Sequence, residues 1–288
     1  MLLDVLIGGI AIGCIYSLIA LGYNIIIRAM DLLHFAQGEV IMVGALTGVT
    51  LAGVLHVPYL VVIPLVMAIC ALLGVALDAC AYGPIRRRGV PTINLIIATL
   101  GASILLVNVA MLIWGSEPIR YPAVYGSTPF VIAGIQIPPQ YLGPLVIGSL
   151  VMIVLQLFFT RSVTGVAMRA AAQDRETARL MGINIDAMVR YTFAISGAIG
   201  GAAGVLLGPI IFATFNMGEI GLKAFVAATL GGLGSMPGAM VGGILFGIIE
   251  TFGALWISSG YKDAIGYAIM IVILLVAPAG LFGRRTHT

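Results

Sequence analysis

The fold is decided by residues 5–27, which read VLIGGIAIGCIYSLIALGYNIII and contain no charged side chain. A helix needs about 20 consecutive, predominantly apolar residues to cross the hydrocarbon core of a bilayer. This stretch meets that requirement, so it predicts a membrane-spanning helix near the start of the chain. Only Met-Leu-Leu-Asp precedes it, without the basic residues that open a signal peptide, and we expect the helix to be retained.

The composition of the whole chain indicates the same environment. Of 288 residues, 61% are hydrophobic and 9% are charged, and the mean hydropathy is +1.15. A soluble domain carries about 25% charged residues, and a disordered chain has far less apolar surface. Both classes are excluded, which leaves a polytopic membrane protein. The chain has no Walker A motif and no strand-led GxGxxG motif, so it is not expected to bind ATP or a dinucleotide by these means.

The predicted fold class is all-α: a polytopic transmembrane helical bundle in a single domain, 1–288. Apolar runs indicate about eight or nine spans. These runs are 5–27, 39–55, 59–81, 92–114, 141–160, 191–213, 219–236, 238–258 and 263–282. Residues 234–238 read GSMPG and separate the seventh run from the eighth, because glycine and proline break helices. The same break also fits a re-entrant pair of half-helices, and the sequence leaves both arrangements open.

Basic residues predict the orientation of this bundle in the bilayer. They cluster at 86–88, 161–190 and 284–285, and short loops rich in arginine and lysine face the cytoplasm. Counting spans from these loops places the N-terminus outside and the C-terminus in the cytoplasm. The loop 115–140 then lies on the periplasmic side, and residues 130–137 within it are expected to form a short hairpin.

The loop 161–190 is the most polar segment of the chain. Its centre, from Ala167 to Met181, is rich in alanine with spaced charges, which favours a short helix. Because this helix lacks a continuous apolar face, we expect it to project into the cytoplasm. It is either a solvated connector or a docking element whose charges fix the register of a partner.

Several stretches, in order along the chain, resemble one transporter family. Residues 176–182 read ETARLMG, which resembles the EAA---G motif in the cytoplasmic loop of ABC importer permeases, with Thr177 where the motif has alanine. Three further stretches are similar to branched-chain amino acid permeases: GYNIIIRAMDLLHFAQGEVIMVGA (22–45), GGLGSMPGAMVGG (231–243) and LVAPAGLFG (275–283). Within that family the chain resembles the shorter of two paired permeases.

This resemblance implies a permease subunit of an ATP-driven importer rather than an enzyme. In the family, a periplasmic binding protein delivers leucine, isoleucine or valine to two different permeases, which pair in the bacterial inner membrane. Two cytoplasmic ATPase subunits bind ATP and magnesium, so no cofactor and no nucleic acid partner are expected for this chain. The residues assigned to coupling with the ATPases are Arg169, Asp174, Arg175, Glu176, Ala178, Arg179 and Gly182.

Charges and breaks inside apolar runs are candidates for the translocation pathway, because a charge is costly in the membrane. Glu250 is the clearest: it either binds a neighbouring helix or receives the ammonium group of a substrate. Glu39 is a second candidate. Gly234 and Pro237 lie at the break and serve as a hinge or pathway element, or as close packing between helices. No metal site is predicted, because the three cysteines and three histidines are scattered.

Other functions remain open from the sequence alone. A permease of the same family can serve urea or short amides, and an ion-coupled secondary transporter would work without partners. The docking helix and the small number of intramembrane charges argue against ion coupling. A membrane-embedded enzyme is disfavoured, because no cluster of aspartate, histidine and serine is visible at one depth.

Overall fold

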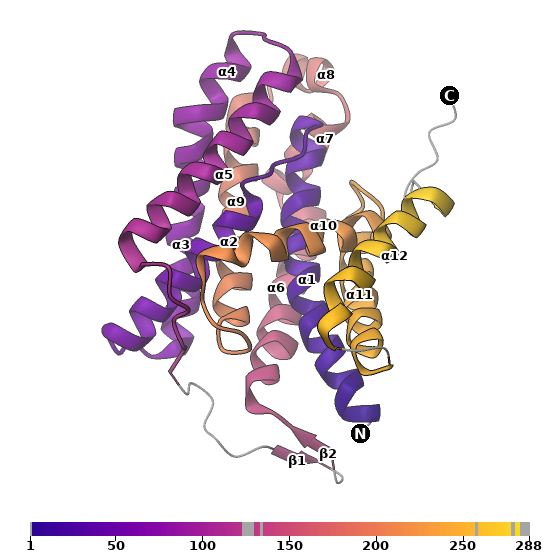
Figure 1. Cartoon of the computed structure of the whole chain (residues 1–288). Coiled ribbons are helices and arrows are strands. Elements are labelled where there is room, and N and C mark those ends of the chain that lie inside the picture. The colour runs from indigo at the N-terminus through magenta and orange to yellow at the C-terminus, as the bar shows by residue number, and fades with distance from the viewer. Residues whose placement is uncertain (1, 123–129, 133–134, 257–258, 278–279, 283–288) are drawn as a thin grey trace.

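The computed structural model describes residues 2–122, 130–132, 135–256, 259–277 and 280–282. Among these residues, seven helical segments are long and apolar enough to cross a membrane. Their helices are α1 (Leu2–Met30), α2 (Gln37–Val49, continued by a π-helical turn Thr50–Val54), α3 (Tyr59–Leu77, continued through Asp78–Tyr82 into α4, Gly83–Arg87), α5 (Thr92–Trp114), α6 (Ser149–Arg161, preceded by the turns Pro139–Tyr141 and Pro144–Gly148), α9 (Ile185–Leu207) and α11 (Met236–Trp256). A multi-pass helical membrane protein is thereby confirmed (Figure 1).

Two predicted spans form shorter helices. The run 219–236 forms α10 (Gly218–Gly231), which has 14 residues, and the run 263–282 forms α12 (Lys262–Val276), which has 15. Both are shorter than the roughly 20 residues that a span needs. Figure 1 shows α10 lying across the long helices. The total of eight or nine spans and the sides of the two termini therefore stay predictions.

The start of α9 also differs from its prediction. The apolar run begins at residue 191, whereas the helix begins at Ile185. The Asn184 side chain accepts a hydrogen bond from the backbone N–H of Ala187 and so caps the helix there. A polar cap at the membrane surface thus extends the helix beyond its apolar part.

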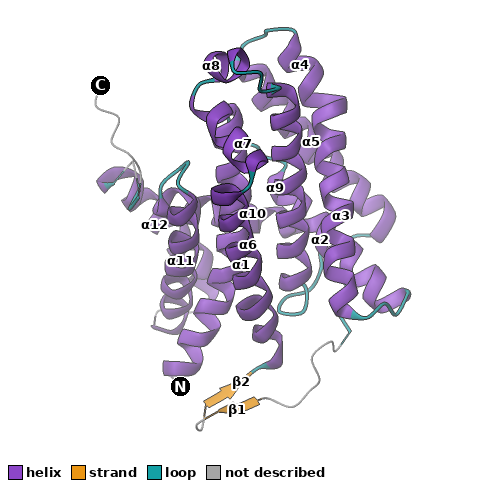
Figure 2. Cartoon of the chain, turned by 180° about the vertical axis from the view of Figure 1, so that it is seen from behind, coloured by secondary structure: helices purple, strands orange, loops and turns teal. Residues whose placement is uncertain are grey.

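The remaining elements lie at the two ends of the bundle. Helices α7 (Val163–Gln173) and α8 (Arg175–Leu180) lie with α4 at one end, and strands β1 (Phe130–Ile132) and β2 (Ile135–Ile137) lie near the N-terminus at the other (Figure 2). The strands pair antiparallel, so the predicted hairpin is confirmed; its turn, 133–134, is outside the described residues. Arg284 and Arg285 are also outside them. The separation of the basic loops from the hairpin agrees with the two sides that the charges predict.

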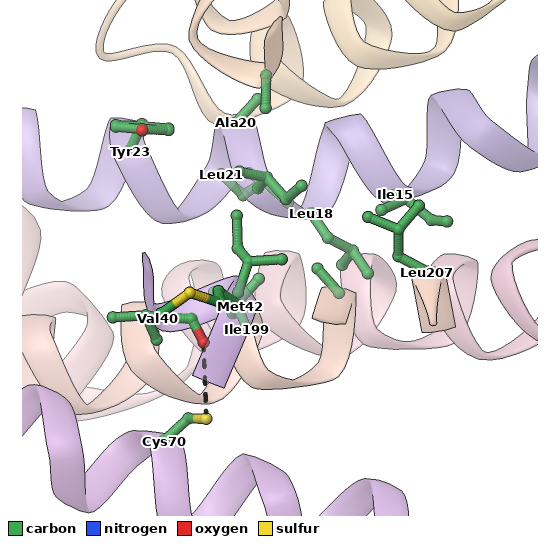
Figure 3. Packing of buried hydrophobic residues seen from close by; sticks show 14 of the residues in the cluster. Ile15, Leu18, Ala20, Leu21, Tyr23, Val40, Met42, Cys70, Ile199 and Leu207 are labelled. Carbon is green, nitrogen blue, oxygen red and sulfur yellow. Dashed lines mark hydrogen bonds between the residues drawn. The ribbon is translucent and has the colours of Figure 1, made fainter. Parts of the chain in front are cut away.

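The core forms where α1 packs between α9 and α11. Ile15 and Leu18 of α1 face Ile199 and Leu207 of α9, and all of these side chains are buried (Figure 3). On the α11 side the backbones approach closely: a Cβ atom added at Gly13 would lie 2.7 Å from Cα of Ile244. Glycine at such positions lets membrane helices pack tightly.

Candidate functional site

Two side-chain caps build the polar segment between α6 and α9. Ser162 Oγ accepts from the N–H of Gly165 to begin α7, and Asp174 Oδ1 accepts from the N–H groups of Glu176 (2.9 Å) and Thr177 (3.1 Å) to begin α8. Asp174 has an extended backbone, so the single helix predicted over 167–181 is wrong: the segment is two helices with a corner at Asp174. Aspartate is a strong N-cap because its side chain satisfies free amide groups.

The end of α8 forms an exposed surface, which we call the coupling tip: Arg175, Glu176, Arg179, Leu180 and Met181. Leu180 and Met181 are 87% and 79% exposed, which is unusual for apolar side chains beside charged ones. Ala178 is buried, and Gly182 ends the helix with φ +83°. The motif residues therefore divide into two groups: Glu176 lies on the surface, whereas Ala178 and Gly182 shape the turn beneath it.

Two sets of contacts fasten this segment to the bundle. Arg175 Nη2 donates to the carbonyl of Ala29 at the end of α1, at 2.7 Å. Arg86, in α4, donates to Asp186 at the start of α9 (3.0 Å) and to the buried Asp78 in the turn that follows α3 (2.8 Å). These arginines join the end of the bundle that carries the coupling tip to α1 and to the α3–α4 helix.

A hollow of about 680 Å³ lies between α7 and the turn before α11. Arg169 of α7 lines one side, and Gly234 and Pro237 line the other. Gly234 has φ +80°, a conformation that side chains with a Cβ rarely adopt, and its N–H donates to Asn24 Oδ1 of α1. The structure thus brings one predicted coupling residue and two predicted pathway residues to the same hollow.

Glu250 lies in a buried network. It is fully buried on α11, where Lys223 Nζ lies 3.0 Å from Oε1 and Tyr16 OH donates to Oε2 at 2.7 Å. The network joins α10, α11 and α1. The sequence analysis missed Lys223 as the partner, because 27 positions separate the two residues and no periodic pattern links them.

Glu39 has a different environment. It is 8% exposed, and its Oε1 accepts from Ser103 Oγ at 3.0 Å, whereas Oε2 has no hydrogen-bond partner among the described residues. Ser103 is the middle residue of α5, so Glu39 lies about 17 Å from either end of that span at 1.5 Å per residue. Glu39 and Glu250 are thus both intramembrane carboxylates, but only Glu39 keeps an oxygen without a partner.

The N-terminal ends of α2 and α10 meet beside Glu39. A Cβ atom at Gly38 would lie 2.5 Å from the carbonyl oxygen of Gly218. The two helices begin with the similar stretches QGEV (37–40) and MGEI (217–220). Two short helices whose starts meet deep in a bundle are typical of transporters, where half-helix ends face the substrate.

No metal centre emerges from this geometry. Within the described ranges, no group of three or more histidine, cysteine, aspartate or glutamate side chains is placed to hold a metal ion. The described cysteines are free, and Cys14 and Cys70 are buried.

The helical spans, the short helix α10 and the exposed two-helix segment define the chain as a multi-pass membrane protein of the transporter class. The family model described as "Branched-chain amino acid transport system / permease component" matches residues 5–274. The chain therefore belongs to the family of branched-chain amino acid transport permeases.

Relatives support this assignment, and a solved structure shares the fold. The chain is 36% identical over 301 residues to the high-affinity branched-chain amino acid transport system permease protein BraD of Pseudomonas aeruginosa, covering 98% of this chain and 96% of the relative. It is 34% identical to LivH of Escherichia coli, a permease protein of the same description, with 96% and 94% covered. A chain of PsaBC from Streptococcus pneumoniae, solved in complex with Fab, has a TM-score of 0.52 at 12% identity, with 97% and 92% covered, and shows the fold alone.

Proposed function

We propose that this chain is a membrane-spanning subunit of an ABC importer that passes leucine, isoleucine and valine into the cytoplasm. The observation that carries the proposal is the similarity to branched-chain amino acid permeases over nearly the whole chain. These relatives favour branched-chain amino acids over urea or short amides. They also favour an ATP-driven importer over an ion-coupled transporter, and a permease is not an enzyme.

The proposed partners are those that the family membership implies. The coupling tip is the docking site for one of the two ATPase subunits, which bind ATP and magnesium, and its exposed Leu180 and Met181 enter an apolar groove of that subunit. Arg175, Glu176 and Arg179 flank these side chains and set the orientation of docking. A second permease completes the transmembrane unit in the bacterial inner membrane, and a periplasmic binding protein delivers the substrate.

The pathway in this proposal runs past Glu39 and leaves beside Gly234 and Pro237. The Glu39 oxygen that has no hydrogen-bond partner in the described part of the chain lies at mid-depth and is available to an ammonium group. Glu250 holds α10 in place instead, because both its oxygens already bind Tyr16 and Lys223.

Uptake in cells tests the substrate. A strain without its own branched-chain importers receives this chain with its ATPase, second permease and binding protein, and labelled leucine uptake is followed. We expect isoleucine and valine to compete and urea or acetamide to have no effect. Uptake that urea or acetamide abolishes, with valine inert, would contradict the proposed substrate class.

A further inference from the structure

The large hollow at the α7 end of the bundle carries two positive charges. Arg28, in the last turn of α1, and Arg169, on α7, both line it. None of the described residues that line it is an aspartate or glutamate. Guanidinium groups bind carboxylates through paired hydrogen bonds, so this lining suits an anionic ligand.

A second, smaller cavity adjoins the two arginines. It has a volume of about 20 Å³ and shares Arg28, Phe159, Arg169 and Met236 with the hollow. Its other lining side chains are apolar except for Thr192. This small cavity has room for little more than a water molecule. The large hollow itself, however, is also lined by Phe159, Val166, Leu233 and Met236. Apolar side chains beside a pair of guanidinium groups suit an amphiphilic anion, whose charged end and hydrocarbon end need different surroundings.

The remaining wall of the hollow provides acceptors for a cation. Gln156, Thr160, Gln173 and Ser235 carry amide or hydroxyl oxygens and line the same space. An amino acid has a carboxylate, an ammonium group and a side chain, and each of them finds matching groups here. An acidic phospholipid such as phosphatidylglycerol also offers an anion with apolar chains, but it has no ammonium group for these acceptors.

We propose that this hollow is a low-affinity exit site, in which Arg28 and Arg169 bind the carboxylate of a branched-chain amino acid before its release. The inference rests on the proposed function, and it adds the residues and the chemical group that the site recognises. Because Arg169 lies on α7, directly before the Asp174 corner, movement of the coupling tip alters the site. ATP hydrolysis is thereby linked to release of the substrate.

Photolabelling tests the site. The full importer is reconstituted in lipid vesicles, and photo-leucine, which keeps both charged groups and carries a diazirine in its side chain, is added on the cytoplasmic side. We expect crosslinks within 156–173 and 233–237, and competition by excess leucine but not by isoamylamine, which lacks the carboxylate. Labelling should fall about tenfold in Arg28→Gln and in Arg169→Gln, because each removes a charge-assisted hydrogen bond.

Two controls sharpen the test. Arg161→Gln removes a charge at the same end of the bundle from a residue that does not line the hollow, and it should label like the wild type. Arg28 lies on α1, outside the polar segment between α6 and α9, so loss of labelling in Arg28→Gln cannot reflect lost ATPase docking. If a variant fails to assemble, competition on the wild-type importer decides the question alone.

Three results would overturn the exit site. They are crosslinks that miss both segments, crosslinks that persist in the two arginine variants, and crosslinks that phosphatidylglycerol displaces while leucine does not, which would identify a lipid site. ATP-driven leucine uptake by the same vesicles is measured in parallel. Uptake with failed labelling rejects only the exit site, whereas absence of leucine uptake rejects the proposed function itself.

Discussion

At the scale of single residues, the buried carboxylates Glu39 and Glu250 differ in their surroundings, although the sequence made both of them candidates for the translocation pathway. Glu250 is bound by Lys223 and Tyr16, while Glu39 keeps one oxygen free of hydrogen bonds among the described residues. The sequence identified both glutamates because charges are rare in apolar runs. That criterion could not distinguish their roles. The distinction depends on which helix lies opposite, and that is set by the fold.

Removing the Glu250 charge should destabilise the protein. Glu250→Gln leaves Lys223 buried without its counterion, and breaking a buried ion pair from one side costs about 3–5 kcal/mol. We expect a lower melting temperature in detergent, with uptake falling in parallel. The double variant Lys223→Met/Glu250→Leu should recover most of the stability. A Glu250→Gln protein as stable as the wild type would refute a structural role.

Glu39→Gln should have the opposite profile. Glutamine keeps the size of the side chain and can still accept from Ser103, so assembly and melting temperature should change little. Uptake of leucine should fall about tenfold or more, because the charge that meets the ammonium group is gone. Uptake at the wild-type rate in a fully assembled importer would remove Glu39 from the pathway.

At the scale of elements, the long spans were predictable and the short helices were not. Runs such as 92–114 matched α5 because a lipid-facing helix must be apolar along its whole length. The run 219–236 reads as equally apolar, yet α10 ends at Gly231, where Gly232 takes φ +107°. Apolar composition does not reveal whether a helix faces lipid or lies inside the bundle, so half-helices resemble spans.

The polar segment between α6 and α9 was also predictable only in part. Its position and exposure were predictable from the charges at 161–190, whereas the corner at Asp174 was not. Alanine-rich sequence favours one continuous helix, but the Asp174 side chain caps a new helix instead. The hollow lined by Arg28 and Arg169 could not be predicted from the sequence, because 141 positions separate these two residues and only the tertiary fold brings them together.

The cap at Asp174 can be tested directly. Asp174→Ala should loosen α8 and weaken ATPase association about fivefold, whereas Asp174→Asn, an equally good cap, should retain it. Hydrogen bonds from the Thr177 hydroxyl and backbone hold the pKa of Asp174 below its ordinary value. The stabilisation from this carboxylate is therefore present at neutral pH and is lost only as the pH falls through the lowered pKa. Pull-down of the ATPase by both variants at pH 7 provides the measurement. Equal association by Asp174→Ala and the wild type would show that the corner has no role in docking.

At the scale of the whole molecule, the fold links a cytoplasmic surface to a route through the bundle. The coupling tip continues through Asp174 into α7, which lines the hollow at Arg169, and Arg175 ties it to the end of α1. The same α1 contacts α9, α10 and α11. In the proposed mechanism, these contacts carry motion from the tip to the exit end of the pathway.

The central claim is that transport by this chain is driven by ATP through the coupling tip. Its most direct test is labelled leucine uptake by vesicles that hold the purified chain with its second permease and ATPase subunits, supplied with binding protein. We predict uptake that requires ATP and every partner, and that Leu180→Asp at the tip abolishes without unfolding the chain. Leucine uptake by this chain alone, driven by a proton or sodium gradient and indifferent to Leu180→Asp, would contradict the account.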